Sequence, residues 1–268
     1  MLGLAPRSDA ARRALPGGRP LFPTSVEARY QRDLLRRTHA ASELLHEAMM
    51  RALAASPGID ERATAARQDS AATDLARLVR VVDQVRVAHA AAYPVDEDKL
   101  RGTAAQVDLF TTREQSRIIP AAPAVDVFQT RGLLDLYTSW AGENAGLITS
   151  IDAQYFDQVR DVIVEAVREG RTTREIAGLL RERYEVSRSR AKFIARDQIA
   201  KLNGQITQQR QTALGVLRYK WSTSLDERVR PTHRVLEGKI FAWAKPPSVG
   251  HPGQDYQCRC VAIPILED

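Results

Sequence analysis

Two histidines and two cysteines near the end of the sequence carry the side chains best suited to metal chemistry. They are His233, His251, Cys258 and Cys260. Thiolate and imidazole groups are the usual ligands of a tetrahedral structural zinc ion. The spacing departs from the common pattern, because the cysteines form Cys-x-Cys and the histidines are eighteen residues apart. A disulfide between the cysteines would be strained. The residue types therefore leave two interpretations open, a structural zinc site and two buried free thiols.

A run of charged residues precedes the first of these histidines. It contains Asp226, Glu227, Arg228 and Arg230, followed by His233. A histidine beside an acid is compatible with acid–base catalysis, but the sequence has no nucleophile elbow, His-Glu-x-x-His, phosphate loop or nucleotide fingerprint. We interpret the run as buried ion pairs that tie a loop to a sheet, and we expect no enzymatic activity. The predicted structural motif comprises Asp226, Arg228, Arg230, His233 and Gly238.

Three short segments around these residues have the pattern of β-strands. Residues 217–223, 239–243 and 260–265 are rich in β-branched and aromatic residues, and the first alternates apolar and polar positions. They predict a small antiparallel sheet built around Trp221, Phe241 and Trp243.

The preceding sequence is rich in Ala, Arg and Leu and has the periodicity of helices. Apolar residues recur every three or four positions from Tyr30 to Ala52, after a helix start at Thr24, and again from Ala71 to Ala92. Two such helices joined by a short Pro-Gly turn form an antiparallel hairpin. Further helices are expected at residues 132–147 and 151–168, with a less regular region at 95–127.

A pair of helices is expected just before the strands, at residues 176–184 and 187–213, with Glu185-Val186 between them. Thr172 and Glu175 form a candidate capping box that opens the first of the two. The outer face of the second helix is expected to carry its amides, including Asn203 and Gln211. A pair of this kind also fits a helix-turn-helix that binds DNA, and this is the alternative function that we consider. The candidate DNA-binding residues are Arg188, Arg190, Lys192, Arg196 and Lys201.

Charge and composition limit the class of protein. The net charge is +6, and residues 171–220 alone contain twelve basic and four acidic residues. Such a basic stretch suits DNA, an acidic protein surface, or simply solvent. No apolar run is long enough to cross a membrane, and the first residues lack the apolar core of a secretory signal. Two cysteines one residue apart do not make a disulfide framework, which fits a reducing compartment.

Several of these segments, taken in order, resemble one known family. They are Ala195-Arg-Asp-Gln198, Lys201-Leu-Asn-Gly-Gln205, Arg218-Tyr-Lys-Trp221, Asp226-Glu-Arg-Val-Arg-Pro-Thr-His233, Leu236-Glu-Gly-Lys239 and Asp255-Tyr-Gln-Cys-Arg-Cys260. This combination, between about Arg188 and Pro264, is similar to the phage Mu F-type minor head proteins, which take part in head morphogenesis. The resemblance implies a virion protein present in few copies near the portal, which assists head assembly and DNA packaging or ejection.

The same resemblance implies partners and a location. The expected partners are the portal protein, the major capsid protein and packaged double-stranded DNA bound without sequence preference, and no membrane is expected. The location would be the phage head, assembled in the cytoplasm of the bacterial host. The expected fold is mainly α, with long helices followed by a small C-terminal α+β module. The expected parts are a basic arm (1–23), a helical domain (24–150), a helical segment of the module (151–215) and its β-containing end (216–268).

Overall fold

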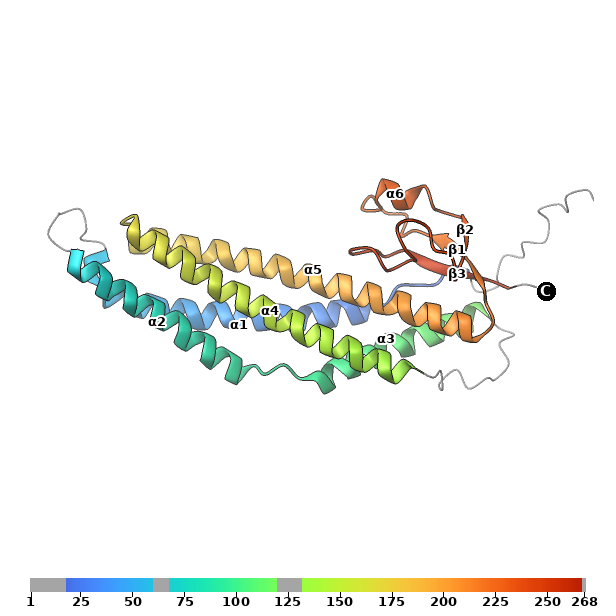
Figure 1. The fold of residues 1–268 in the computed structure, drawn as a ribbon, viewed down its shortest axis with the longest axis horizontal. Helices are drawn as coiled ribbons and strands as arrows, with labels where there is room; N and C mark the ends of the chain where they lie inside the picture. Colours follow the sequence, from blue (N-terminus) through green and yellow to red (C-terminus); the bar gives the residue numbers. More distant parts are fainter. Residues whose placement is uncertain (1–17, 60–67, 120–131, 267–268) are drawn as a thin grey trace, which may run out of the picture. The chain divides into compact units, whose positions relative to one another are not determined.

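The computed structural model describes residues 18–59, 68–119 and 132–266, and these are mainly helical (Figure 1). The first seventeen residues of the expected arm lie outside the described residues. In chain order the elements are α1 (Thr24–Ala54), the short η2 (Pro57–Ile59), α2 (Gln68–Ala92), α3 (Glu97–Ile118), α4 (Leu133–Arg168), α5 (Thr173–Ala213), β1 (Arg218–Ser222), α6 (Pro231–Arg234), β2 (Ile240–Ala242) and β3 (Val261–Ile265). The predicted fold class, long helices followed by a small antiparallel sheet, is confirmed.

The chain forms two compact units, each assembled from separate stretches of sequence. We call residues 24–105 and 134–199 the helical unit, and residues 1–23, 106–133 and 200–268 the sheet unit. Both α3 and α5 contribute residues to each unit. In the described part of the chain, no helix is both long and apolar enough to cross a lipid bilayer.

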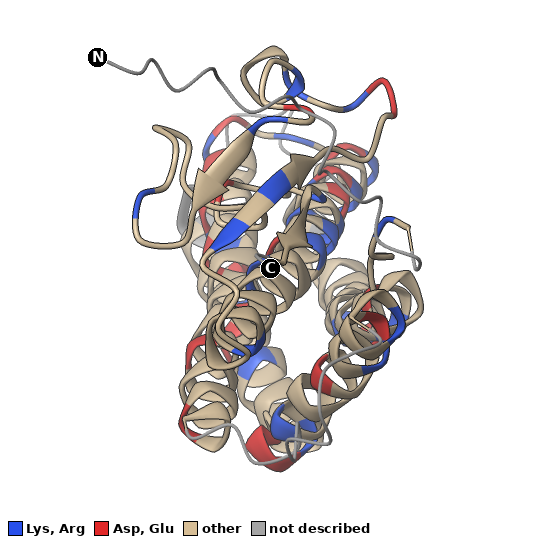
Figure 2. Cartoon of the chain, turned by 90° about the vertical axis from the view of Figure 1, so that its right-hand side faces the viewer, with Lys and Arg blue, Asp and Glu red and all other residues tan. Residues whose placement is uncertain are grey.

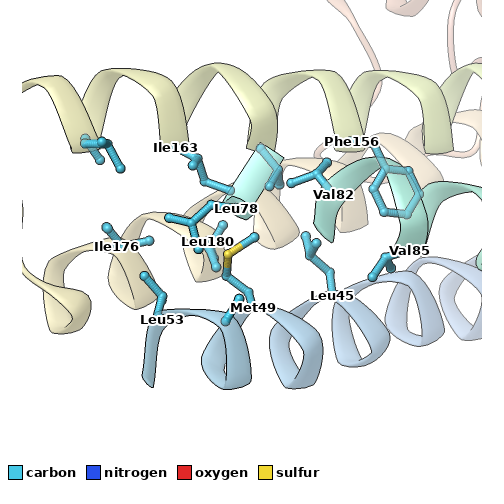
Figure 3. Close-up of a cluster of buried hydrophobic side chains, with 14 of the residues drawn as sticks. Leu45, Met49, Leu53, Leu78, Val82, Val85, Phe156, Ile163, Ile176 and Leu180 are labelled. Atoms are coloured by element: carbon cyan, nitrogen blue, oxygen red, sulfur yellow. The ribbon is translucent and has the colours of Figure 1, made fainter. Parts of the chain in front are cut away.

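The helical unit has a core made by the apolar faces of α1, α2, α4 and the first part of α5 (Figure 3). Met49, Leu78, Val82 and Phe156 have no exposed surface. Helices α1 and α2 lie side by side and run in opposite directions (Figure 1), and Arg77 of α2 hydrogen-bonds Ser56 just after α1 (3.0 Å). The predicted hairpin is therefore confirmed.

Two helices are longer than the sequence pattern indicated, and a third forms where a less regular region was expected. Helix α4 continues through Thr149, whose hydroxyl bonds the Ala145 carbonyl (2.9 Å). Helix α5 passes without interruption through the expected turn at Glu185-Val186. The helix pair, and with it the helix-turn-helix interpretation, is wrong, because no Gly or Pro lies there to end the helix. Within residues 95–119, the described part of the less regular region, the chain forms α3, whose start is capped by the Asp96 carboxylate on Lys99 N (3.0 Å).

The start of α5 was located correctly from the sequence. Thr172 and Glu175 form a reciprocal capping box, in which Thr172 N donates to Glu175 Oε2 (2.8 Å) and Glu175 N donates to Thr172 Oγ1 (3.3 Å). Gly170 adopts φ +72° between α4 and α5, as expected for a residue that ends a helix.

The sheet unit contains the three predicted strands in the order β2-β1-β3, all antiparallel. In β1 the exposed Arg218 and Lys220 alternate with Tyr219 and Trp221, which are fully buried. Trp243 and both cysteines pack against this buried face, with Phe241 at its border. The sheet is thus built around the aromatic residues that the sequence indicated.

Candidate metal centre

His233 lies in the middle of the sheet unit, on a helix of a single turn. Pro231 begins α6, where its missing N–H and fixed φ fit the first helical position. The His233 side chain is 3% exposed, and its ring packs edge-on against Trp221, with 5.4 Å between the ring centroids. The imidazole is therefore held by the core and cannot turn freely toward solvent.

Both cysteines approach one nitrogen of this imidazole. Nδ1 of His233 lies 3.5 Å from Sγ of Cys258 and 3.6 Å from Sγ of Cys260. All three candidate ligand atoms lie within 4.8 Å of one another, and the three residues are buried. The ligands come from two loops, one between β1 and β2 and the other between β2 and β3.

The other imidazole nitrogen is bound by an acid. Nε2 of His233 lies 3.0 Å from Oδ2 of Asp255. Arg230 donates to the same carboxylate oxygen (2.8 Å) and also to the Tyr256 carbonyl. A carboxylate beside Nε2 favours a proton on that nitrogen, and Nδ1 then faces the two sulfur atoms.

His251 does not join this cluster in the structure. Its Nδ1 is hydrogen-bonded to the Tyr219 hydroxyl (2.8 Å), and its ring packs on Trp243 with centroids 4.8 Å apart. Burial lowers the pKa of His251, and a hydrogen bond to the Trp243 backbone opposes that shift. Of the four residues that the sequence singled out, His233, Cys258 and Cys260 are brought together and His251 is placed elsewhere.

The two thiols are in different electrostatic surroundings. A hydrogen bond from Cys260 lowers the pKa of the Cys258 thiol to about 5, and bonds from His233 and Gly253 N act in the same direction. The same bond and burial raise the pKa of Cys260. Hydrogen bonding to Cys258 raises the pKa of His233. The cluster therefore favours negative charge on at least one sulfur.

The remaining residues of the predicted structural motif shape the loops around the cluster. The Asp226 carboxylate accepts a hydrogen bond from Arg228 N (3.0 Å), so it forms a local turn and is not the acid beside His233. Gly238 adopts φ +72°, and its N–H bonds the Trp221 carbonyl (2.9 Å) at the entrance to β2. The sequence interpretation overlooked Asp255, although this residue begins the segment that contains both cysteines.

The loop before the cysteines contacts the backbone of α5 at two glycines. A Cβ on Gly204 would lie 2.4 Å from the Pro252 carbonyl oxygen, and one on Gly253 would lie 2.6 Å from the Ala200 carbonyl oxygen. Gly253 also has φ +89° and donates its N–H to Sγ of Cys258 (3.5 Å). The close approach of backbone to backbone therefore helps to place the Cys258 loop.

We expect Gly204→Ala to lower the free energy of unfolding by about 1–3 kcal/mol, because neither backbone can withdraw from the added methyl group. Gly178→Ala, in the same helix, is the matched control, since its Cβ would meet nothing within 4 Å. That control should raise stability by up to about 1 kcal/mol, because alanine is the better helix former. Urea denaturation of both variants measures the difference. Equal effects at the two positions would show that the contact at Gly204 has no energetic weight.

A buried amide network joins three elements of the sheet unit. Gln211 of α5 has no exposed surface, and its Nε2 donates to Gln115 of α3 (3.2 Å) and to the Ala262 carbonyl of β3 (3.0 Å). Its Oε1 accepts from Trp243 Nε1 (3.2 Å). Asn203 is also buried and accepts from Thr111 (3.1 Å). The expectation of an outer amide face is therefore wrong for Asn203 and Gln211, because α3 and the sheet cover that side of α5, whereas Gln205 is exposed as expected.

The five candidate DNA-binding residues have varied surroundings along α5. Arg188 pairs with Glu185 (3.1 Å) and Arg196 approaches Glu27 (3.8 Å). Arg190 bonds Ser150 (3.2 Å), and the Lys201 ammonium lies 5.1 Å from the ring centre of Tyr256. Lys192 is exposed. In the view of Figure 2, basic and acidic positions are interspersed along the helices.

Sequence comparison finds a similarity to one family over the segment that contains the cluster. Residues 157–263 match the model of the family described as Phage Mu protein F like protein. An uncharacterized protein of Haemophilus influenzae is 44% identical over 126 residues, which cover 47% of this chain and 28% of that protein. An uncharacterized protein of Methanocaldococcus jannaschii is 35% identical over 119 residues, covering 44% and 19% of the two chains.

A third relative has a named activity. The NAD(+)--arginine ADP-ribosyltransferase EFV of Enterococcus faecalis is 25% identical over 216 residues, covering 72% of this chain and 44% of that protein. The chain thus spans less than half the length of each of these relatives. No solved structure matches it. The matched segment contains all of α5, β1 and β2, the first residues of β3 and the His233–Cys258–Cys260 cluster, and over residues 157–263 this chain is similar to the Phage Mu protein F-like family.

Proposed function

We propose that this chain is a phage head morphogenesis protein, a minor component of the head present in few copies near the portal. The observation that carries the proposal is the match of residues 157–263 to the Phage Mu protein F-like family. The proposed partners are the portal protein, the major capsid protein and packaged DNA. The proposed location is the virion, after assembly in the cytoplasm of the host.

The structure is compatible with a scaffold of this kind. The 41 residues of α5 form a single helix that supplies part of both compact units. A helix held by packing on its apolar positions and by buried amides such as Gln211 resists bending better than two short helices joined by a turn. A component that holds its place between larger assemblies needs such stiffness.

Contact with packaged DNA would be electrostatic in this proposal. Residues 171–220 carry a net charge of +8 from twelve basic and four acidic residues. The exposed Lys192 is the best-placed of the candidate residues, since Arg188 and Arg196 already have carboxylates nearby. Binding of this kind is independent of sequence and weakens steeply with salt.

Quantitative mass spectrometry of purified DNA-filled particles, empty heads and free lysate tests the proposal. We expect a few copies of the chain in each filled particle and cross-links between it and the portal protein. Detection in lysate alone would overturn the assignment to the head. Equal abundance throughout the shell would contradict a position near the portal.

An enzymatic role is an alternative function, since the Enterococcus relative is named as an ADP-ribosyltransferase. We propose that the activity of that protein belongs to the part that this chain does not share. Incubation of the purified chain with labelled NAD+ and an arginine-containing acceptor should give no transfer of label. Transfer above that of a heat-denatured control would establish the enzymatic role.

A further inference from the structure

The arrangement around His233 has a geometric property that a chance meeting of buried side chains does not require. Zinc bonds nitrogen at about 2.0–2.1 Å and sulfur at about 2.3 Å, so two such ligands at a tetrahedral angle lie about 3.5 Å apart. The observed distances from Nδ1 of His233 to Sγ of Cys258 and Cys260 are 3.5 and 3.6 Å. Both are edges of the expected tetrahedron.

Hydrogen bonding alone explains this geometry less well. Whether it carries a lone pair or a proton, Nδ1 of an imidazole makes one good hydrogen bond, in the ring plane. Two sulfur atoms nevertheless lie at nearly equal distances from it. A cation placed between the three atoms gives each of them a partner.

The surroundings also have the form that supports a bound metal. A metal-ligating histidine commonly donates its second N–H to a carboxylate, which sets the ring orientation and tautomer. Asp255 holds this position at 3.0 Å and is itself fixed by Arg230 at 2.8 Å. The Gly253 N–H points at Sγ of Cys258 (3.5 Å), which would stabilise a thiolate ligand.

We propose that His233, through Nδ1, and the thiolates of Cys258 and Cys260 bind a structural zinc ion, with Asp255 positioning the imidazole. Two thiolates and one imidazole are a ligand set that zinc favours. The metal would join the loop after β1 to the loop before β3. A three-stranded sheet with a small core gains most from such a cross-link. This inference concerns the stability of the module and does not depend on the proposed role in the phage head.

Metal content of the full-length chain is the first test. We expect about one zinc ion per chain after purification without chelator and dialysis against zinc, because the site offers one tetrahedral position. Cys258→Ser and Cys260→Ser should each lose most of this metal. His251→Gln should keep it, since Tyr219 and Trp243 occupy that ring. If His251→Gln also loses most of its zinc, the three-ligand assignment is overturned.

The unaltered chain supplies a second measurement, because a variant that does not fold would lose zinc for another reason. Replacement of zinc by Co2+ should produce thiolate-to-cobalt charge-transfer absorption and the intense visible bands of tetrahedral cobalt. Both cysteines should resist alkylation until a chelator is added, and the chelator should lower the melting temperature. A chain with no cobalt spectrum and with thiols indifferent to chelator would contain two buried free thiols, and the proposal would fail.

The role of Asp255 has its own test in the same chain. Asp255→Asn should still bind one equivalent at saturating zinc but with a dissociation constant about 10–100-fold higher, because the imidazole loses its orienting carboxylate. Asp226→Asn is the matched control, since that carboxylate caps a local turn. If both variants bind zinc as the unaltered chain does, Asp255 has no positioning role.

Discussion

Asp108→Asn is expected to lower the free energy of unfolding by about 3–5 kcal/mol, because it leaves a buried guanidinium without its counter-charge. Arg210 of α5 is 1% exposed, and its Nε and Nη2 donate to the two carboxylate oxygens of Asp108 in α3, each at 2.7 Å. Such a bidentate ion pair is strong while both partners are present, and removal of one partner lowers the stability of the fold.

Two comparisons make this prediction specific. Asp98→Asn removes the acid of an exposed pair in the same helix, where Asp98 is 86% and Arg101 39% exposed, and should cost less than about 1 kcal/mol. The double variant Asp108→Leu/Arg210→Met should be more stable than Asp108→Asn, because no charge remains buried. Urea denaturation followed by tryptophan fluorescence measures all three. A cost at Asp108 no greater than that at Asp98 would contradict the prediction.

Leu78→Ala is expected to destabilise the helical unit by about 2–5 kcal/mol, since it removes a fully buried side chain and leaves a cavity between α1, α2 and α4. Figure 3 shows Leu78 in the middle of this cluster, among Met49, Val82 and Ile163. The close packing of long helices leaves little room for the neighbours to collapse into the space.

The matched substitution for this prediction is Leu134→Ala in α4, where the same chemical change affects a side chain that is 78% exposed. It should alter stability by less than about 0.5 kcal/mol. Loss of helical circular dichroism in urea gives both values. Similar midpoints for Leu78→Ala and Leu134→Ala would show that the cluster contributes little to stability.

Much of the local structure could be read from the sequence, because its causes are local. The capping box at Thr172 and Glu175 marks the start of α5, and the alternation in residues 218–222 marks β1. The resemblance to phage head proteins also rested on short ordered motifs, and the family match at residues 157–263 confirms it. The predicted helix break at Glu185-Val186 was wrong, since no residue there ends a helix.

The candidate centre shows where sequence reasoning ended. The residue types pointed to a shared site for His233, His251, Cys258 and Cys260, but spacing alone does not say which side chains a loop turns inward. In the structure His251 is bound by Tyr219, and Asp255 is the acid that meets His233. These assignments depend on the path of the loop over α5, where Gly204 and Gly253 allow the two backbones to approach.

The sequence by itself determined most of the helical segments, the three strands, the chemical character of the His and Cys residues and the similarity of the C-terminal module to a known family. Each of these follows from residue type and from spacing over a few positions. Only the tertiary structure decided that Gln211 and Arg210 are buried, and that two cysteines meet Nδ1 of one histidine. Burial and ligand geometry are set by contacts between residues far apart in the chain, and one sequence does not display those contacts.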